Sequence, residues 1–542
     1  NYLFVNLRIA PETLPGTFRI DFRKGRSKAA SRTYVLHARA PGSADRAGFG
    51  PQDTIYLITP DRFANGDPSN DTVKGIPDGL NRTQRLGRHG GDLLGISNHL
   101  DYLAGMGYTQ LWLNPVLANN QPEVTYHGYA ITDFYKVDPR FGTNESFRQL
   151  VADARQRGVG MIMDMVLNHC GSQHWWMQDL PSRDWFNNDS QFVATTHVRE
   201  TLQDTHAAAD DRRLFSDGWF VATMPDMNQR NPHLATYLIQ NSLWWVEYAG
   251  LSGIRVDTYS YSDRAFLTEW SRRMTQEYQN LNIVGEEWSS NPSTVAYWQR
   301  GRNPPDGYVS YLPSLFDFAL QEAVAMGLKE AEGWGTGLRR IYKVLAQDSV
   351  FPDPYNLVVF HDNHDMSRMF TALGERQDLN RMALAFLLTT RGIPQIFYGT
   401  EVLMGNKGTE DHGIIRSDFP GGWAGDAKNA FTGQGLSDDE RAMQDYTRKL
   451  LQWRRTASAL REGKLTHYVP MDGVYVYFRH DEAQKIMVVL NNGDVARTLD
   501  TRRFHEMIGT AATGTDVLSQ QAHDLARGVT VAARSATILE LH

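Results

Sequence analysis

The sequence has 542 residues but only one cysteine, Cys170. A single cysteine cannot form an intramolecular disulfide, and it also excludes zinc or iron–sulfur sites that need several thiolates. No apolar run approaches the roughly 18 residues of a membrane-spanning helix, and the longest obvious one, Met382 to Leu388, fits a buried helix. Basic residues number 55 against 62 acidic ones, a net charge of −7, which argues against a nucleic-acid ligand. We therefore expect no membrane and no nucleic acid among the partners.

The remaining composition is that of a folded protein with large cores. Hydrophobic residues make up 41% of the chain and charged residues 22%, which is not the balance of a disordered polypeptide. The first residue is Asn1, and no signal-like apolar segment precedes it. We therefore expect a processed or truncated start, with any targeting peptide removed from the chain as given.

Both ends of the chain have the composition of β-structure. Residues 1–45 contain two strand-like segments, Tyr2–Val5 and Thr17–Phe22, with turn residues between them. This is too short for a sandwich of about 100 residues, so it predicts a partial N-terminal β-sandwich. Residues 459–542 predict a C-terminal β-sandwich. Its expected strands are Val474–Arg479, Lys485–Leu490, Val529–Ala533 and Ala536–Leu541.

Between these ends, residues 46–458 alternate short apolar strands with amphipathic segments such as Asn144–Arg157. Eight such strands predict an α/β protein whose parallel sheet closes into a (β/α)8 TIM barrel. About 70 residues separate the third strand from the helical pattern at Leu234–Tyr248, which is too long for a loop and predicts a small inserted domain at about 170–230. The expected strands are Thr54–Thr59, Gln110–Leu113, Met161–Val166, Gly253–Val256, Ile283–Glu286, Leu315–Phe318, Leu357–Phe360 and Gln395–Tyr398.

Polar residues gather where four of these strands end. Strand three leads to Asn168-His169, strand four to Arg255-Val-Asp257, strand five to Glu286 and strand seven to His364-Asp365. In a barrel the carboxyl ends of the strands form the active-site face, so these side chains are expected to converge. Two carboxylates can cleave a glycosidic bond, one as nucleophile and one as proton donor, and an arginine beside the nucleophile favours its charged form.

Each of these residues also has an ordinary structural interpretation. A single aspartate at a strand end often caps a helix, and a lone histidine or arginine often serves the framework. Glu287 is expected to be structural because neighbours on a strand point to opposite faces. The functional interpretation depends on the joint occurrence at four strand ends.

The motifs at these strand ends resemble the signature regions of the α-amylase family, glycoside hydrolase family 13, over residues 54–540. Several further segments match in the same order, which makes the resemblance specific. The matching segments are Asp164–His169, Gly253–Asp257, Gly285-Glu286 and His361–Asp365, with Met224–Asn228, Gly107–Pro115 and Gly392–Glu401.

The resemblance implies a role for each matched residue. Asp257 matches the nucleophile, Glu286 the general acid/base, and Asp365 the carboxylate that helps to bind and distort the sugar. The family retains the anomeric configuration, which implies a carboxylate pair roughly 5–5.5 Å apart. The residues that match the lining of the cleavage site are Tyr129, as stacking platform, and His169, Arg255 and His364.

The segment after Asp257 departs from the commonest pattern, because it reads Thr258-Tyr-Ser-Tyr261 where many α-amylases have Lys-His. With the β-rich start, this resembles the cyclomaltodextrinase, neopullulanase and maltogenic amylase branch. We expect a retaining hydrolase of α-1,4 bonds in cyclodextrins and short maltodextrins. A neopullulanase or α-amylase acting on pullulan or starch, a transglycosylase, and a non-catalytic glucan-binding barrel are the alternatives.

A calcium site is the expected cofactor site. The stretch from Asn65 to Asp71 concentrates side-chain oxygens, and Asp92 follows shortly. Hard oxygen donors without Cys or His suit Ca²⁺, although a turn rich in Asn and Asp has the same composition. The branch resemblance implies a structural Ca²⁺ without a role in bond cleavage. The expected ligands are Asn65, Asp67, Asn70, Asp71, Gly90 through its carbonyl, and Asp92.

The resemblance also bears on assembly and location. The branch often dimerises through its N-terminal sandwich, so a homodimer is possible, and we expect a bacterial periplasmic or secreted protein. The tryptophans of the inserted segment are either sugar platforms or, more ordinarily, packing residues. These are Trp175, Trp176, Trp185 and Trp219.

Overall fold

The computed structural model describes residues 2–542. Its centre is a sheet of eight parallel strands in the order β10-β9-β8-β7-β4-β3-β12-β11. A parallel bridge from Phe316, just after β10, to Val358 on β11 joins the two outer strands, so the sheet closes into a (β/α)8 barrel. The strands are β3 Ile55–Ile58, β4 Gln110–Leu113, β7 Gly160–Val166, β8 Gly253–Asp257, β9 Asn282–Gly285, β10 Ser314–Leu315, β11 Val358–Phe360 and β12 Ile393–Phe397.

All eight strands predicted from the sequence are present, with differences at their ends. The clearest difference is in the sixth strand, predicted over Leu315–Phe318 but observed only at Ser314–Leu315. The reason is local, because the Asp317 side chain accepts a hydrogen bond from the Leu320 amide and starts helix α8 at Phe318. The prediction was therefore wrong over the last part of that segment.

Helices surround the barrel and several have side-chain caps. Helix α3 begins with a capping box between Thr143 and Ser146, and α13 with one between Ser437 and Glu440. The helices up to α8 are α1 Leu93–Asn98, α2 Leu100–Met106, α3 Asn144–Gln156, α4 Ala209–Asp217, α5 Pro232–Trp245, α6 Arg264–Glu277, α7 Pro292–Ala296 and α8 Phe318–Lys329. The others are α9 Arg339–Leu345, α10 Met369–Ala372, α11 Gln377–Thr389, α12 His412–Ile415, α13 Asp438–Arg454, α14 Ser458–Arg461 and α15 His505–Ile508. No helix within residues 2–542 combines the length and apolarity needed to cross a membrane.

Two long excursions leave the barrel at the carboxyl ends of its strands. The first follows β4 and carries a small antiparallel pair, β5 Leu117–Ala118 and β6 Asp133–Val137. The second, between β7 and α5, is the predicted insert at about 170–230. Apart from α4 and short single-turn helices it is irregular, and single bridges such as His169 to Asp226 close it into a compact loop structure.

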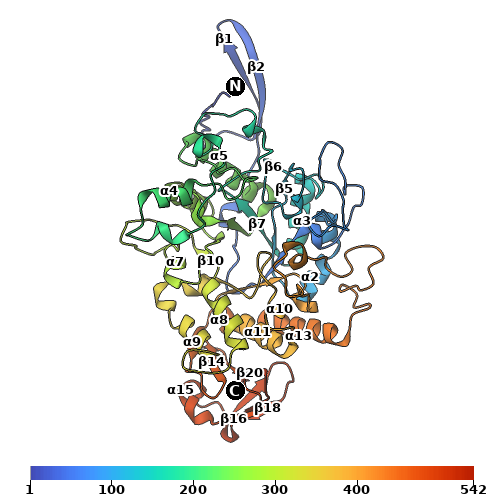
Figure 1. Ribbon diagram of the computed structural model, residues 1–542, viewed down its shortest axis with the longest axis vertical. Coiled ribbons are helices and arrows are strands. Elements are labelled where there is room, and N and C mark those ends of the chain that lie inside the picture. The colour runs from blue at the N-terminus through green and yellow to red at the C-terminus, as the bar shows by residue number, and fades with distance from the viewer. Residues whose placement is uncertain (1) are drawn as a thin grey trace.

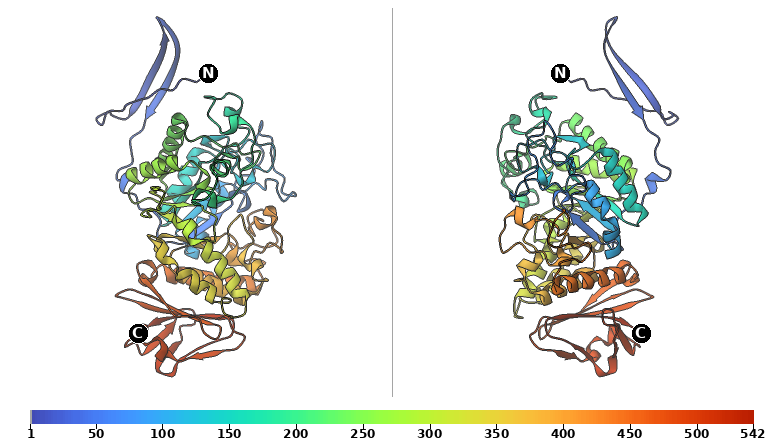
Figure 2. Two further views of the ribbon diagram at one scale, coloured as in Figure 1. Left: turned by 60° about the vertical axis from the view of Figure 1, so that its left-hand side comes forward. Right: turned by 90° about the vertical axis from the view of Figure 1, so that its right-hand side faces the viewer.

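The N-terminal region is smaller than a sandwich. It is one hairpin of β1 Gly16–Lys24 and β2 Ser27–Leu36, which projects from the barrel in Figure 1 and in both views of Figure 2. The strand predicted at Tyr2–Val5 is wrong, because that segment is irregular. Its apolar side chains contact the barrel instead, with the Phe4 ring stacked on His233 at 3.8 Å.

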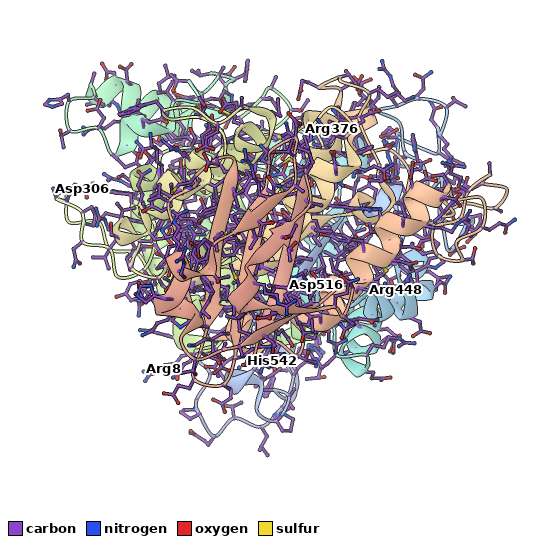
Figure 3. The ribbon with its side chains drawn as sticks, turned by 90° about the horizontal axis from the view of Figure 1, so that it is seen from below. Arg8, Asp306, Arg376, Arg448, Asp516 and His542 are labelled. Atoms are coloured by element: carbon purple, nitrogen blue, oxygen red, sulfur yellow. The ribbon has the colours of Figure 1, made fainter. Side chains whose placement is uncertain are left out.

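The C-terminal region forms two β-layers after α14. A six-stranded antiparallel sheet in the order β13-β14-β15-β20-β17-β18 faces the pair β16-β19. Val476, Phe478 and Leu539 of the large sheet share a core with Val529 and Val531 of the pair, as expected for a sandwich. Seen from below, these strands lie in front of the barrel (Figure 3). The strands are β13 Lys464–His467, β14 Val474–His480, β15 Lys485–Asn491, β16 Arg497–Leu499, β17 Thr513–Asp516, β18 Ala522–Asp524, β19 Val529–Val531 and β20 Ser535–Leu541.

Candidate active site

A cavity of about 500 Å³ lies at the carboxyl ends of the barrel strands. The three carboxylates predicted from the sequence, Asp257, Glu286 and Asp365, all line it, as do Tyr129 and His169. Arg255 and His364 lie beneath this surface and are almost fully buried. The other lining residues are His127, Arg199, Phe220, Met224, Thr258, Tyr261, Trp288, His412 and Arg416.

Arg255 connects the carboxylates below the cavity floor. Its Nη1 lies 2.8 Å from Asp164 and 2.8 Å from Asp257, and its Nη2 lies 2.7 Å from Glu286. Arg255 and Asp257 are two residues apart on β8 and therefore point to the same face of the strand. One guanidinium thus holds the strand-four and strand-five carboxylates close to each other.

The backbone after β8 also orients Glu286. Thr258 adopts a left-handed conformation with φ 41°, which is uncommon for a branched residue. Its amide donates to the Glu286 carboxylate at 3.0 Å, and its hydroxyl donates to Asp257 at 3.2 Å. This turn therefore gives each carboxylate a hydrogen bond in addition to its ion pair with Arg255, which helps to offset the cost of the strained backbone.

Asp365 is held by two cationic or potentially cationic partners. His364 Nε2 lies 3.0 Å from one carboxylate oxygen, and Arg416 donates to the other at 2.5 Å. Arg416 also donates to the His364 carbonyl at 2.7 Å. These contacts fix Asp365 at the edge of the cavity.

Tyr129 and His169 form part of the cavity wall. The Tyr129 hydroxyl bonds Asp164 at 2.9 Å and His364 at 2.7 Å, and its ring stacks on His364 with an angle of 6° between the planes. Burial lowers the pKa of His169 to about 3, so the ring is neutral at ordinary pH. Its Nε2 has no hydrogen-bond partner among the described residues and is free to bond a ligand hydroxyl.

The carboxylates of the cavity differ in protonation. Burial raises the pKa of Asp257, and the nearby Glu286 adds to this while Arg255 opposes it. For Asp365, burial is outweighed by His364 and Arg416, which hold its pKa well below the usual range. The protein environment therefore shifts the pKa values of Asp257 and Asp365 in opposite directions.

Several cavity residues were missed by the sequence analysis. Arg416 comes from helix α12 and the loop after it, far from any strand-end motif. A wall of Phe220 and Tyr261, whose ring centroids lie 5.4 Å apart, closes another side. The His197 ring, 3.0 Å from the Tyr261 hydroxyl, and the Arg199 guanidinium over the Tyr261 ring support this wall from the insert. The only sequence feature that pointed to this wall was the segment Thr258–Tyr261, which departs from the commonest family pattern.

The residues predicted to bind a cation also come together. The Asn65 amide donates to Asp71 at 2.8 Å, and a Cβ added to Gly90 would lie 2.5 Å from Asp71. The Asn70 amide lies 3.4 Å from Asp92, which also caps α1 through the Gly95 amide. Asp67 is joined to the group through its amide, which donates to Asp92 at 2.8 Å, whereas its own carboxylate accepts from Ser69.

The donor set of this group is mixed. Within residues 2–542 no three His, Cys, Asp or Glu side chains converge as a metal site. The buried Oδ1 atoms of Asn65 and Asn70 have no hydrogen-bond partner in the described structure. Amide oxygens with a glycine carbonyl and carboxylates are hard donors, so the residues present fit a Ca²⁺ ion.

An eight-stranded α/β barrel with carboxylates around a buried arginine at its carboxyl end is the arrangement expected of a glycoside hydrolase. The family model described as "Alpha amylase, catalytic domain" matches residues 57–488. The models for the cyclomaltodextrinase N-terminal and C-terminal domains match residues 1–40 and 465–540. The chain belongs to the α-amylase family.

Among curated proteins, neopullulanase 2 of Thermoactinomyces vulgaris is 30% identical over 82% of this chain and 70% of its own length. A cyclomaltodextrinase of Geobacillus thermopakistaniensis is 28% identical over the same shares. The chain spans only 36% of a Paenibacillus polymyxa β/α-amylase that is 28% identical. The solved α-amylase of Geobacillus thermoleovorans superposes with a TM-score of 0.73 at 27% identity, covering 91% of this chain and 98% of that one.

Glu287, next to Glu286, is completely buried, so its protonation affects the stability of the folded protein. Burial raises its pKa from 4.5 to about 7, against the opposing effect of Ser260. The folded state therefore binds more protons than the unfolded state between these values. The free energy of unfolding contributed by Glu287 should fall as pH rises through this range and level off above it.

We expect Glu287→Gln to remove this dependence. Relative to the wild type, the variant should gain stability between pH 5 and 8, by about 3 kcal/mol at most. Chemical denaturation of both proteins across this range measures the difference. Two parallel stability curves would contradict the assignment.

Proposed function

We propose that the protein is a retaining hydrolase of α-1,4-glucosidic bonds in cyclodextrins and short maltodextrins. The observation that carries this proposal is the pair Asp257 and Glu286, joined by Arg255 at the floor of the cavity. A carboxylate pair held close together suits a covalent, retaining mechanism, whereas an inverting pair must leave room for water.

In the first step Asp257 attacks the anomeric carbon and Glu286 donates its proton to the glycosidic oxygen, so the leaving sugar departs with that proton. In the second step Glu286 accepts a proton from water as the water oxygen displaces Asp257. Arg255, 2.8 Å from Asp257, favours the anionic form that attacks.

The other predicted residues suit substrate binding. Asp365, ionised and held by Arg416, can accept hydrogen bonds from two sugar hydroxyls. His169 has a free ring nitrogen for a third hydroxyl. Tyr129 lies against His364 and offers an apolar ring edge or face to the sugar. These contacts would orient the ring whose bond is cleaved.

The preference for cyclic and short substrates rests on the cavity wall. Phe220, Tyr261 and Trp288 narrow a space of about 500 Å³, which favours compact ligands over long chains. The family domains at both ends and relatives named cyclomaltodextrinase support the same preference. Pullulan and starch are the alternative substrates, since another relative is named neopullulanase. Transfer of the glucosyl group to a sugar in place of water is a further alternative.

Parallel incubations with β-cyclodextrin, pullulan and soluble starch, followed by chromatography of the products, test this proposal. We expect the cyclodextrin to open fastest. Asp257→Asn and Glu286→Gln should each lower turnover by about a hundredfold or more, because each removes a reacting group.

Starch or pullulan cleaved first would refute the cyclodextrin preference and leave the catalytic pair intact. Wild-type turnover in either variant would refute the pair itself. No turnover of any glucan, including a chromogenic maltoside, would favour the non-catalytic glucan-binding barrel.

We also propose that Asn65, Asp67, Asn70, Asp71, Gly90 and Asp92 hold a structural Ca²⁺. The two buried amide oxygens without partners support this, since a cation would satisfy both. Burial and the nearby Asp92 raise the pKa of Asp71, and the charge of a cation would offset both effects. The ion would fasten the loop after β3 to the start of α1 and takes no part in bond cleavage.

Chelation with EDTA should therefore lower the melting temperature, and added Ca²⁺ should restore it, because an ion bound only to the folded state stabilises that state. Asp71→Ala should abolish this response, and Asp438→Ala, on a fully exposed carboxylate, should keep it. A wild-type melting temperature that changes with neither EDTA nor Ca²⁺ would contradict the site. An equal change of melting temperature in the two variants would contradict it as well.

The N-terminal hairpin supports a proposal of homodimerisation. Phe18 and Tyr34 pair across β1 and β2 and are both exposed, at 42% and 37%. An exposed apolar pair on a projecting hairpin is typical of an interface. We propose that a second copy of this chain is its partner. We also propose that the protein is periplasmic or secreted.

Sedimentation should give twice the chain mass of 61.4 kDa. The double variant Phe18→Ser and Tyr34→Ser should shift the protein to the monomer, because it removes the apolar pair. A wild-type monomer at micromolar concentration, or an unaffected dimer in the variant, would refute the proposed interface.

A further inference from the structure

A second cavity, of about 540 Å³, lies between residues 73–76 of the loop after β3, the excursion after β4 and the start of the insert. We call it the Trp175 cavity. Asn120 and Thr132 line it from the excursion, and Gln173, Trp175 and Gln178 line it from the insert. None of these residues lines the active site. Its volume is that of an ordinary small-molecule site.

Trp175 differs from the other tryptophans of the insert. Trp176, Trp185 and Trp219 are 2–4% exposed and serve as packing residues, whereas Trp175 is 44% exposed. Its ring packs against His174, at 4.1 Å between centroids. A held but exposed indole offers an apolar surface that the C–H face of a sugar can cover.

The polar groups of the Trp175 cavity are mostly uncharged. The side-chain amides of Asn120, Gln173 and Gln178 make no hydrogen bond to any other described residue. Each amide offers both donors and an acceptor. The charged lining residues are Lys74, Asp133 and Lys136, which leave a small net charge. Free amides beside an indole fit a neutral ligand rich in hydroxyl groups.

We propose that the Trp175 cavity binds a segment of α-glucan outside the active site. This inference rests on the proposed function, since it takes the same substrate class. Two segments contribute lining residues to both cavities. Tyr129 of the active site lies on the same excursion as Asn120, and His169 lies four residues before Gln173. The Gln121 and Ser172 side chains, 3.1 Å apart, join the two segments. A chain held at Trp175 would keep its other residues at high effective concentration beside the active site.

The first test measures binding without cleavage. Asp257→Asn protein is run through native gels that contain soluble starch, with and without a second substitution. Trp175→Ala should weaken retention about fivefold, because it removes the stacking surface, and Trp175→Phe should restore most of it. Trp334→Ala is the matched control, since Trp334 is 94% exposed and lines none of these cavities. Retention of Trp175→Ala equal to that of its parent overturns the proposal.

The second test uses the otherwise unchanged enzyme. Trp175→Ala should keep the kcat/KM for a chromogenic maltoside within about twofold and lose about fivefold on soluble starch. An equal loss on both substrates would place Trp175 in the active site and overturn the proposal. If Trp175→Ala does not fold, as judged by its melting temperature, the double variant Asn120→Ala and Gln178→Ala is held to the same expectations. Absence of all hydrolysis would count against the proposed function alone, because the gel test does not need turnover.

Discussion

The active site depends on the charge of Arg255. This guanidinium is 1% exposed and touches Asp164, Asp257 and Glu286. Three buried carboxylates without it would repel one another and lose their main compensating charge. With it, the cavity can hold an anionic nucleophile beside a protonated acid, which is the combination that glycoside cleavage requires.

The barrel supplies this arrangement through the parallel register of its strands. Asp164 pairs with Arg255 across β7 and β8, so both residues lie at the same height. Glu286 comes directly after β9, where its amide bonds the Val256 carbonyl. The two excursions add Tyr129 and Phe220, and the segments after β8 and α12 add Tyr261 and Arg416. The strands thus fix the reacting groups, and the connecting segments shape the space around them.

The sequence predicted the barrel well because its strands are short, mostly buried apolar segments, four of which lead into polar residues at their carboxyl ends. It failed where tertiary contacts decide the structure. Tyr2–Val5 has strand composition but lies irregularly against the barrel, and Asp317 ends β10 by capping a helix. Arg416 could not be found because no local pattern marks a residue that reaches Asp365 from 51 positions away. Likewise, the exposure of Trp175 among three buried tryptophans depends on packing that composition does not encode.

The central claim is that Asp257 and Glu286, joined by Arg255, form a close pair that acts through a covalent intermediate. Proton NMR of the sugar released in the first minutes of hydrolysis tests it most directly, before the anomers equilibrate. The account predicts that the new reducing end appears as the α-anomer, the configuration of the bond that was cleaved. Initial release of the β-anomer would mean single displacement by water and would contradict the account.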